Sequence, residues 1–285
     1  MNTLSSADSY VQAAQVIHIR ASAPAAGTLV LVHGLGGDTT QFDAFLPHLT
    51  RLPYDVLLPD LRGHGKTTLT GDAGDFTFQQ FSADLAALLT ARSIPRPLVG
   101  VGISMGAGVL AALAIQEPQL FGGLVFIRPA WEDRPDPGNL RAFRVIADLL
   151  ATRDNAAAAA EFARSAVYQA IRRESETVAN SLMDQFAAPH AAARHVRLAR
   201  MPMSAPFADL ADLQRIRVPV AVIGTRHDPL HPLDIARDWA DSCHTTLHVV
   251  PPRQASDDRY VTESAAIIAT VAGQVRDCSS KGPLS

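Results

Sequence analysis

The chain alternates between short, continuous apolar runs and longer segments that have one apolar face. Apolar runs, typical of strands buried on both faces of a parallel sheet, fall at 28–33, 54–58, 97–101, 124–127, 218–224 and 246–250. Residues 16–19 alternate between apolar and polar as an edge strand would. Helical periodicity or helix-forming composition covers 76–91, 105–117, 233–240 and 260–275. This order predicts an α/β fold with a mostly parallel central sheet flanked by helices.

The alternation stops after Ile127. A turn-rich segment at 132–138 comes first, and no strand pattern occurs between 139 and 201. Four helices are predicted there, marked by apolar positions at 140–150, 162–166, 178–186 and 195–198. We therefore expect a core formed by 16–128 and 214–275, a helical cap inserted at 129–213, and flexible tails at 1–15 and 276–285.

Composition limits the class of protein. The chain has 285 residues, of which 47% are hydrophobic and 19% charged, and its net charge is −3. These values predict a soluble globular protein that binds neither nucleic acid nor a membrane. No apolar run approaches the roughly 20 residues that span a bilayer, and the first 15 residues have no secretory pattern. With only Cys243 and Cys278, a reducing, cytoplasmic location is expected. The oligomeric state stays open, with a homodimer as one option.

Residues 102–106 read Gly-Ile-Ser-Met-Gly and lie between a predicted strand and a predicted helix. In the pattern G-x-S-x-G at such a junction, the serine sits on a sharp turn with its hydroxyl exposed above the sheet. The turn requires a backbone near positive φ, and the flanking glycines let strand and helix approach. The sequence therefore predicts Ser104 as a nucleophile, which would need a neighbouring base to activate it.

Several motifs occur in an order that resembles the α/β hydrolases with a helical cap, over about residues 16–275. They are His33-Gly34 after a strand, the segment 60–65 (Asp-Leu-Arg-Gly-His-Gly) after the next, the turn at Ser104, the insertion after Ile127, and Asp228 in the loop after the 218–224 strand. The resemblance is specific for the fold, but it does not name a substrate, because this fold hosts many reactions.

The resemblance assigns roles to individual residues. It implies that the backbone amides of Leu35 and Met105 form the oxyanion hole and that Asp228 is the acid of a catalytic triad. His33, Arg62 and His64 would be structural residues that shape loops. A serine at position 104 disfavours epoxide hydrolases and dehalogenases, because those members of the fold use aspartate there.

The chain departs from the family at the histidine of the triad. The family order is Ser, Asp, His, with the histidine after the last strand, yet the loop 251–260 contains none and has Gln254-Ala255 at about that place. A base could come from His227, His231, His190 or His195. The first two are poor substitutes if the loop is extended, because neighbours of Asp228 would then point away from it. Alternatively, Tyr260 fills the space as a proton donor, or the protein only binds a ligand.

The cap residues Trp131, Phe143, Phe162 and Phe186 predict a small, largely apolar substrate. The preferred hypothesis is a serine-hydrolase-like enzyme with a modified triad that acts on an ester, thioester or lactone. The alternatives are a non-hydrolytic lyase, isomerase or cyclase of the same fold, or a catalytically inactive ligand-binding relative. No cofactor is expected, because the glycines at 34–37 match no phosphate-binding pattern, and no metal is expected either.

Overall fold

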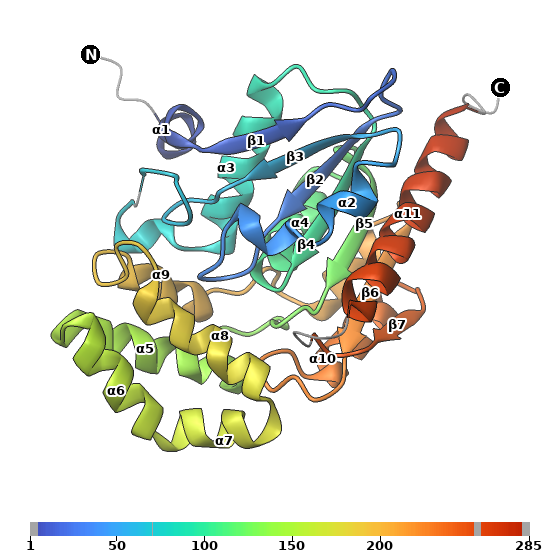
Figure 1. Cartoon of the computed structure of the whole chain (residues 1–285). Coiled ribbons are helices and arrows are strands. Elements are labelled where there is room, and N and C mark those ends of the chain that lie inside the picture. The colour runs from blue at the N-terminus through green and yellow to red at the C-terminus, as the bar shows by residue number, and fades with distance from the viewer. Residues whose placement is uncertain (1–4, 70, 254–257, 281–285) are drawn as a thin grey trace, which may run out of the picture.

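The centre of the computed structural model, which describes residues 5–69, 71–253 and 258–280, is a seven-stranded sheet (Figure 1). The strand order is β1-β3-β2-β4-β5-β6-β7. The strands are β1 (Val16–Ile19), β2 (Thr28–Val32), β3 (Asp55–Pro59), β4 (Leu98–Ile103), β5 (Phe121–Ile127), β6 (Val220–Thr225) and β7 (Leu247–Val250). Only β1 is antiparallel to its neighbour. The predicted mostly parallel sheet is confirmed.

Helices cover both faces of the sheet because its central strands are buried on both sides. Along β2, Val30 and Val32 join the core beneath α3 (Phe78–Ala91), α4 (Met105–Gln116) and α10 (Leu233–Ser242). Leu29 and Leu31 join the core beneath α2 (Leu46–Leu49) and α11 (Arg259–Ser280). The period of two thus places alternate side chains in two separate cores.

The insertion between β5 and β6 holds α5 (Arg141–Thr152), α6 (Asn155–Arg164), α7 (Ala166–Glu174), α8 (Glu176–Ala187) and α9 (His195–Arg200). Figure 1 shows this cap at one end of the sheet. The cap has five α-helices where four were predicted, because the helix is interrupted at Ser165. The backbone there is extended, and the Ser165 hydroxyl accepts the Tyr168 N–H at 3.1 Å, capping α7.

Short 3₁₀ helices connect the larger elements: η1 (Thr39–Phe42), η2 (Ala73–Asp75), η3 (Gly138–Leu140), η4 (Met201–Met203) and η5 (Leu210–Arg215). The last of these packs against α4 and α10, so the end of the segment predicted as cap lies on the core.

The segments expected as flexible tails, 1–15 and 276–285, are partly helical in their described residues. Helix α1 (Ser6–Ala13) packs on α3, and the buried Tyr10 hydroxyl donates to the Asp60 carbonyl at 3.1 Å. At the other end, α11 continues to Ser280 because its apolar face, including Val275, packs against the sheet. Residues 1–4 and 281–285 lie outside the described part.

Within the described ranges, no helix combines the length and the apolar character needed to cross a membrane. The same residues contain no group of three or more His, Cys, Asp or Glu side chains placed to hold a metal ion.

Candidate active site

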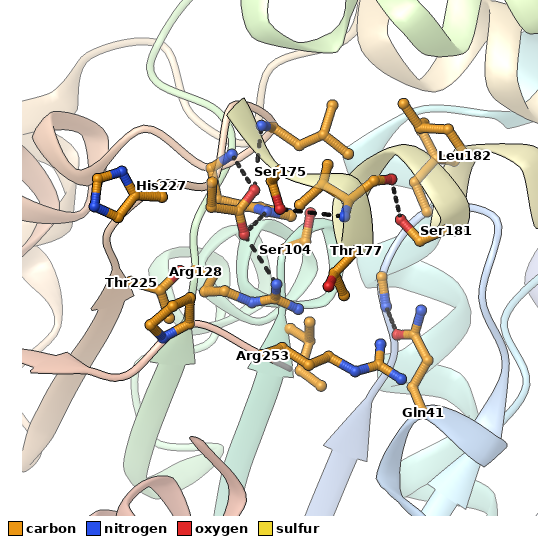
Figure 2. Close-up of a pocket in the computed structure, with 18 of the residues that line it drawn as sticks. Gln41, Ser104, Arg128, Ser175, Thr177, Ser181, Leu182, Thr225, His227 and Arg253 are labelled. Carbon is orange, nitrogen blue, oxygen red and sulfur yellow. Dashed lines mark hydrogen bonds and ion pairs between the residues drawn. The ribbon is translucent and has the colours of Figure 1, made fainter. Parts of the chain in front are cut away.

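A cavity of about 770 Å³, including its open mouth, lies at the carboxyl ends of the strands beneath α8 (Figure 2). Crevices at this edge are where parallel α/β sheets bind ligands. Its walls come from segments far apart in the chain: Gly34, Leu35 and Gln41 after β2; Ile103 at the end of β4 and Ser104 after it; Arg128 after β5; Phe143, Ser175, Thr177, Val178, Ser181, Leu182 and Gln185 from the cap; Thr225 at the end of β6 and His227, Asp228, Leu230 and His231 after it; and Pro252 and Arg253 after β7.

Ser104 occupies the turn between β4 and α4 with φ 54° and ψ −111°. The glycines around it are required by space. A Cβ at Gly106 would lie 2.1 Å from the Val32 carbonyl oxygen, and one at Gly102 would lie 2.4 Å from the carbonyl carbon of Gly106. The Ser104 amide donates to the Ile127 carbonyl at 2.9 Å, which fixes the turn to β5. A strained serine held in this way presents its hydroxyl to the cavity.

The two predicted oxyanion donors lie on either side of Ser104. Leu35 lines the cavity, and Met105 begins α4 directly after the serine. Among the described residues, neither backbone N–H has a hydrogen-bond acceptor. Both amides are therefore available for a ligand oxygen, and their assignment to an oxyanion hole stays a prediction.

His33 and His64 hold the loop that carries Leu35. The Nδ1 of His33 is 2.9 Å from the Gly34 carbonyl oxygen, and its Nε2 accepts the Leu61 N–H at 3.0 Å. The Nδ1 of His64 is 2.8 Å from the Arg62 carbonyl oxygen, and its Nε2 accepts the Gly36 N–H at 3.1 Å. These partners assign a neutral ring with the proton on Nδ1 to both residues.

Burial lowers the pKa of both histidines, and the neighbouring His33 and Arg197 lower the pKa of His64 further. Neither side chain lines the cavity. Their contacts agree with the structural role that the family resemblance implies.

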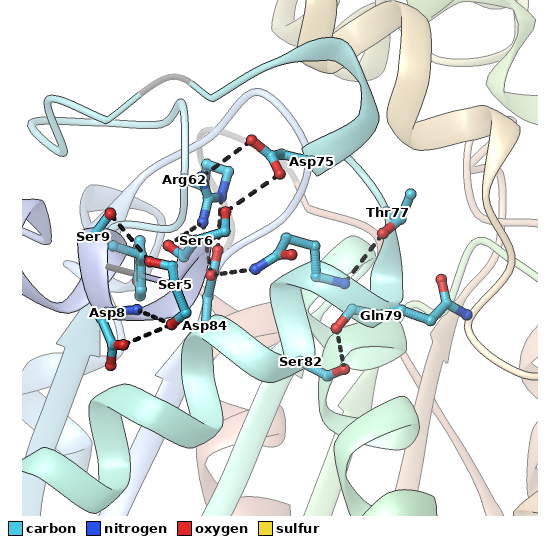
Figure 3. Close-up of polar contacts among 12 residues, drawn as sticks. Ser5, Ser6, Asp8, Ser9, Arg62, Asp75, Thr77, Gln79, Ser82 and Asp84 are labelled. Carbon is cyan, nitrogen blue, oxygen red and sulfur yellow. Dashed lines mark hydrogen bonds and ion pairs between the residues drawn. The ribbon is translucent and has the colours of Figure 1, made fainter. Parts of the chain in front are cut away.

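Arg62, in the loop after β3 that also carries His64, connects that loop to the scaffold (Figure 3). Its guanidinium makes two hydrogen bonds of 2.8 Å to the Asp84 carboxylate on α3. It also donates to the Ser6 carbonyl at 2.9 Å, and a third nitrogen lies 3.5 Å from Asp75. Arg62 and Asp84 are each 1% exposed, so this forked ion pair is sheltered from solvent.

Asp228 is the most heavily engaged group in the cavity. It accepts hydrogen bonds from the backbone amides of Leu230 and His231, both at 3.2 Å. The Nη1 of Arg128 lies 3.0 Å from its Oδ2. Burial alone would raise the pKa of Asp228, but His231 and Arg128 outweigh burial and hold that pKa well below its usual range. The carboxylate is therefore ionised at neutral pH.

His231 contacts Asp228, and the expectation that it would point away is wrong. The loop is not extended: the His231 amide donates to the Asp228 carbonyl at 3.1 Å, which closes a turn. That turn brings the imidazole Nδ1 to 2.9 Å from Oδ2 of Asp228. The side chain is 11% exposed and lines the same cavity as Ser104.

The other candidate histidines lie apart from this pair. Figure 2 shows the ring of His227 well to one side of Ser104, and the residue is exposed with φ 57°. His190 and His195 do not line the cavity. Gln254 and Ala255, which stand where the family has its histidine, lie outside the described residues.

Arg128 is the functional candidate that sequence reasoning missed. It directly follows β5 with a strained φ of 48°, and its Cζ lies 5.2 Å from the ring centre of Tyr260. Tyr260 is 3% exposed and lines a second, adjoining cavity, not the one that contains Ser104. Its assignment as a proton donor stays a prediction. The sequence feature that could have identified Arg128 is its position directly after a buried strand, because residues there lie at the carboxyl edge of the sheet.

The cavity wall is more polar than the cap composition predicts. Of the four cap aromatics, only Phe143 lines it. Phe162 and Phe186 pack on each other with ring centres 5.6 Å apart, and Trp131 packs on Phe78 at 5.1 Å. These rings are buried in the molecule because they cover one another. The cavity wall therefore combines apolar side chains with hydroxyl, amide and guanidinium groups, and the expectation of a largely apolar substrate stays a prediction.

Comparison with known proteins places the chain in a family. A family model described as the alpha/beta hydrolase fold matches residues 27–254. The chain belongs to the α/β-hydrolase family. As a member it is an enzyme, and hydrolysis is the general activity that the names of its relatives indicate.

Three similar proteins illustrate the range of this family. A putative carbamate hydrolase, RutD, from Stutzerimonas stutzeri is 33% identical, and the match covers 77% of this chain and 80% of RutD. A pyrrolizixenacetamide deacetylase from Xenorhabdus hominickii is 28% identical over 73% and 76%. A thermophilic esterase from Thermogutta terrifontis has the same fold, with a TM-score of 0.71 at 20% identity, covering 92% of this chain and 94% of that one.

Proposed function

We propose that this protein is a serine hydrolase whose Ser104 is acylated by a small carbonyl substrate, an ester, thioester, lactone or amide. In this proposal His231 is the base and Asp228 is the acid of the triad. The observation that carries the proposal is the 2.9 Å contact between His231 Nδ1 and Asp228 Oδ2 in the cavity that Ser104 lines. The contact supplies an acid and a base although the loop after β7 has no histidine.

The reaction follows from the atoms that this arrangement leaves free. With the His231 Nδ1–H donating to Asp228, Nε2 carries the lone pair that takes the proton from Ser104 Oγ. The serine oxygen bonds to the substrate carbonyl carbon, and the carbonyl oxygen becomes an anion next to the Leu35 and Met105 amides. The His231 proton then moves to the leaving group, which departs. Water repeats the same steps and releases the acid.

The charge state of Asp228 supports this role. A carboxylate whose pKa is held low stays ionised while His231 gains and loses its proton, and it stabilises the imidazolium that forms. The printed names of the relatives, carbamate hydrolase and deacetylase, both describe hydrolysis at a carbonyl, which agrees with acyl chemistry at Ser104.

A fluorophosphonate probe followed by intact mass tests the proposal. We expect one adduct on the wild type and none on Ser104→Ala. His231→Gln and Asp228→Asn should react at least ~100-fold more slowly, because a positioned base contributes roughly 10²–10⁴. His195→Gln is the matched control, since His195 lies outside the cavity, and it should react at the wild-type rate. Unchanged labelling of His231→Gln would show that the base is elsewhere.

A non-hydrolytic reaction is the second candidate, and one observation favours it. Arg128 binds Oδ2 of Asp228, the same oxygen that His231 contacts, and so competes with the histidine for the carboxylate. In a lyase, isomerase or cyclase, this guanidinium would stabilise an anionic intermediate without acylation of Ser104. Such an enzyme would give no fluorophosphonate adduct on the folded wild type and would still turn over its substrate as Ser104→Ala.

A further inference from the structure

Two cavities adjoin behind Ser104. The first contains Ser104, and the second is lined by Tyr260 and residues of the segment after β2. They share Gln41, Ile103, Arg128 and Arg253. Ile103 directly precedes the serine, so a ligand with its reacting carbonyl at Ser104 can place its other end where the cavities meet.

That junction holds hydrogen-bond donors that have no acceptors. Arg253 makes no ion pair with any described residue. Arg128 uses Nη1 on Asp228, but its buried Nε is without a hydrogen-bond partner. The hydroxyl of Tyr260, next to the Arg128 guanidinium, is also buried, and its own proton has no acceptor. Unpaired buried donors are costly, and each that persists in a native structure calls for an explanation.

Two arginines, Arg128 and Arg253, line both cavities at the junction. Asp228, the only carboxylate among the described lining residues of the first cavity, is already engaged by Arg128, His231 and two backbone amides. Asp43, at the edge of the second cavity, is exposed. The cap contributes neutral hydroxyls from Ser175 and Thr177. Figure 2 shows the Arg253 side chain near that of Gln41, and both residues line both cavities.

We propose that Arg253, Arg128 and Tyr260 bind a carboxylate of the substrate, so that the enzyme acts on acyl compounds with a free carboxylate at the end opposite the scissile bond. This rests on the proposed acyl chemistry at Ser104. A guanidinium presents a planar fork of N–H groups that matches a carboxylate. Arg253 supplies that fork, and the Arg128 Nε–H and the Tyr260 hydroxyl are the further donors on the opposite wall. The family has its catalytic histidine in the loop after β7. In this chain the same loop supplies Arg253, whose guanidinium would bind the substrate carboxylate.

A pair of substrates that differ only in charge tests the assignment: the mono-4-nitrophenyl ester of glutaric acid and the same ester with its free carboxylate methylated. We expect kcat/KM of the wild type to be at least ~10-fold higher for the acid, as a charged hydrogen-bonded pair provides. Arg253→Gln should lose this preference, mainly through KM, and Arg253→Lys should keep part of it. Arg253 is exposed, so these variants retain their packing.

Two further variants set the limits of the effect. Arg217→Gln removes an exposed arginine outside both cavities and should keep the full preference. Tyr260→Phe removes only the unpartnered hydroxyl and should reduce the preference about threefold. Equal kcat/KM for the acid and its methyl ester in the wild type, or the same loss in Arg217→Gln, would overturn the proposal.

A binding measurement separates this proposal from the acyl chemistry. Glutarate should bind Ser104→Ala by calorimetry and should bind the Ser104→Ala, Arg253→Gln double variant at least ~10-fold more weakly. Binding of this kind with no fluorophosphonate adduct would support the carboxylate site and reject the serine mechanism. Labelling of Ser104 without glutarate binding would reject the carboxylate site alone. Inorganic phosphate binding as tightly as glutarate would show a free-anion site and overturn the substrate assignment.

Discussion

The loops on the two sides of Ser104 differ in how completely their polar groups are satisfied. On the β2–β3 side, both nitrogens of His33 and of His64 have backbone partners, and Arg62 is forked onto Asp84. On the β5–β6 side, an ionised Asp228 is shared by Arg128 and His231, and buried polar atoms remain unpaired. The polar groups of the first side are thus paired within the protein, whereas the second side leaves donors that a ligand can use.

Backbone strain follows the same division. Among the described residues, the positive-φ positions in the loops after β2 and β3 are the glycines Gly36, Gly63, Gly65 and Gly71, which tolerate it. In the loops after β5 and β6 they are Arg128, Asp136 and His227, which have side chains and carry a conformational cost. Strain of this kind is typical of sites where the surroundings fix a reactive geometry.

The largest expected effect is the loss of stability when the Arg62–Asp84 ion pair of the first side is removed. Asp84→Ala leaves the Arg62 guanidinium buried without its partner, and the free energy of unfolding should fall by roughly 3–5 kcal/mol. The control is Asp234→Ala, which removes an exposed ion pair with Arg237 and should change stability by less than about 0.5 kcal/mol. Urea unfolding measures both. Similar small losses in the two variants would mean that the first side is no more rigid than the surface.

A second prediction uses pH to sharpen the comparison. The folded-state pKa of His64 lies well below the value of about 6.5 expected in the unfolded chain. Below about pH 6.5 the unfolded state therefore binds a proton that the folded state excludes, and stability falls as pH decreases. His64→Gln keeps an acceptor for the Gly36 amide but does not titrate. Between about pH 6.5 and pH 5 its stability should fall less steeply than that of the wild type, by up to about 1.4 kcal/mol per pH unit.

Urea unfolding at several pH values measures these slopes. Asp228, on the second side, affects stability in a different pH range from His64. Its pKa is also lowered, but from the lower starting value of a carboxylate. Its contribution is complete above about pH 4 and is lost only below that. Parallel slopes for the wild type and His64→Gln between about pH 6.5 and pH 5 would contradict a neutral, buried His64.

The smallest predicted effect compares two buried threonines. Thr28, at the start of β2, donates its hydroxyl to the Pro95 carbonyl at 2.7 Å, whereas the Thr225 hydroxyl, at the end of β6 in the cavity wall, has no partner. Thr28→Val should lower stability by about 1 kcal/mol, and Thr225→Val should leave it unchanged or raise it slightly. Thermal unfolding of the two variants measures the difference. Equal losses would show that the Thr225 hydroxyl is as well satisfied as that of Thr28.

The sequence predicts the sheet well because buried strands and helices have distinct hydrophobic periods. The turn at Ser104 is predictable for a related reason, since glycines at 102 and 106 are the residues that its close contacts allow. Asp228 in the cavity follows from its place after β6. The contact between His231 and Asp228 could not be predicted, because it depends on a turn within four residues. Arg128 was missed because a single arginine after a strand has no periodic pattern.

The cap is attached to the core unevenly. Arg194, at the start of α9, donates to the carbonyls of Gly65 and Thr67 at 2.7 and 3.2 Å. On the α8 side, the described polar link to the loop that carries Leu35 is one bond of 3.3 Å from Gln185 to the Gly36 carbonyl. A movement that exposes Ser104 and keeps the Arg194 bonds would break this one bond and displace α8. We therefore expect ligand exchange on the α8 side of the cap.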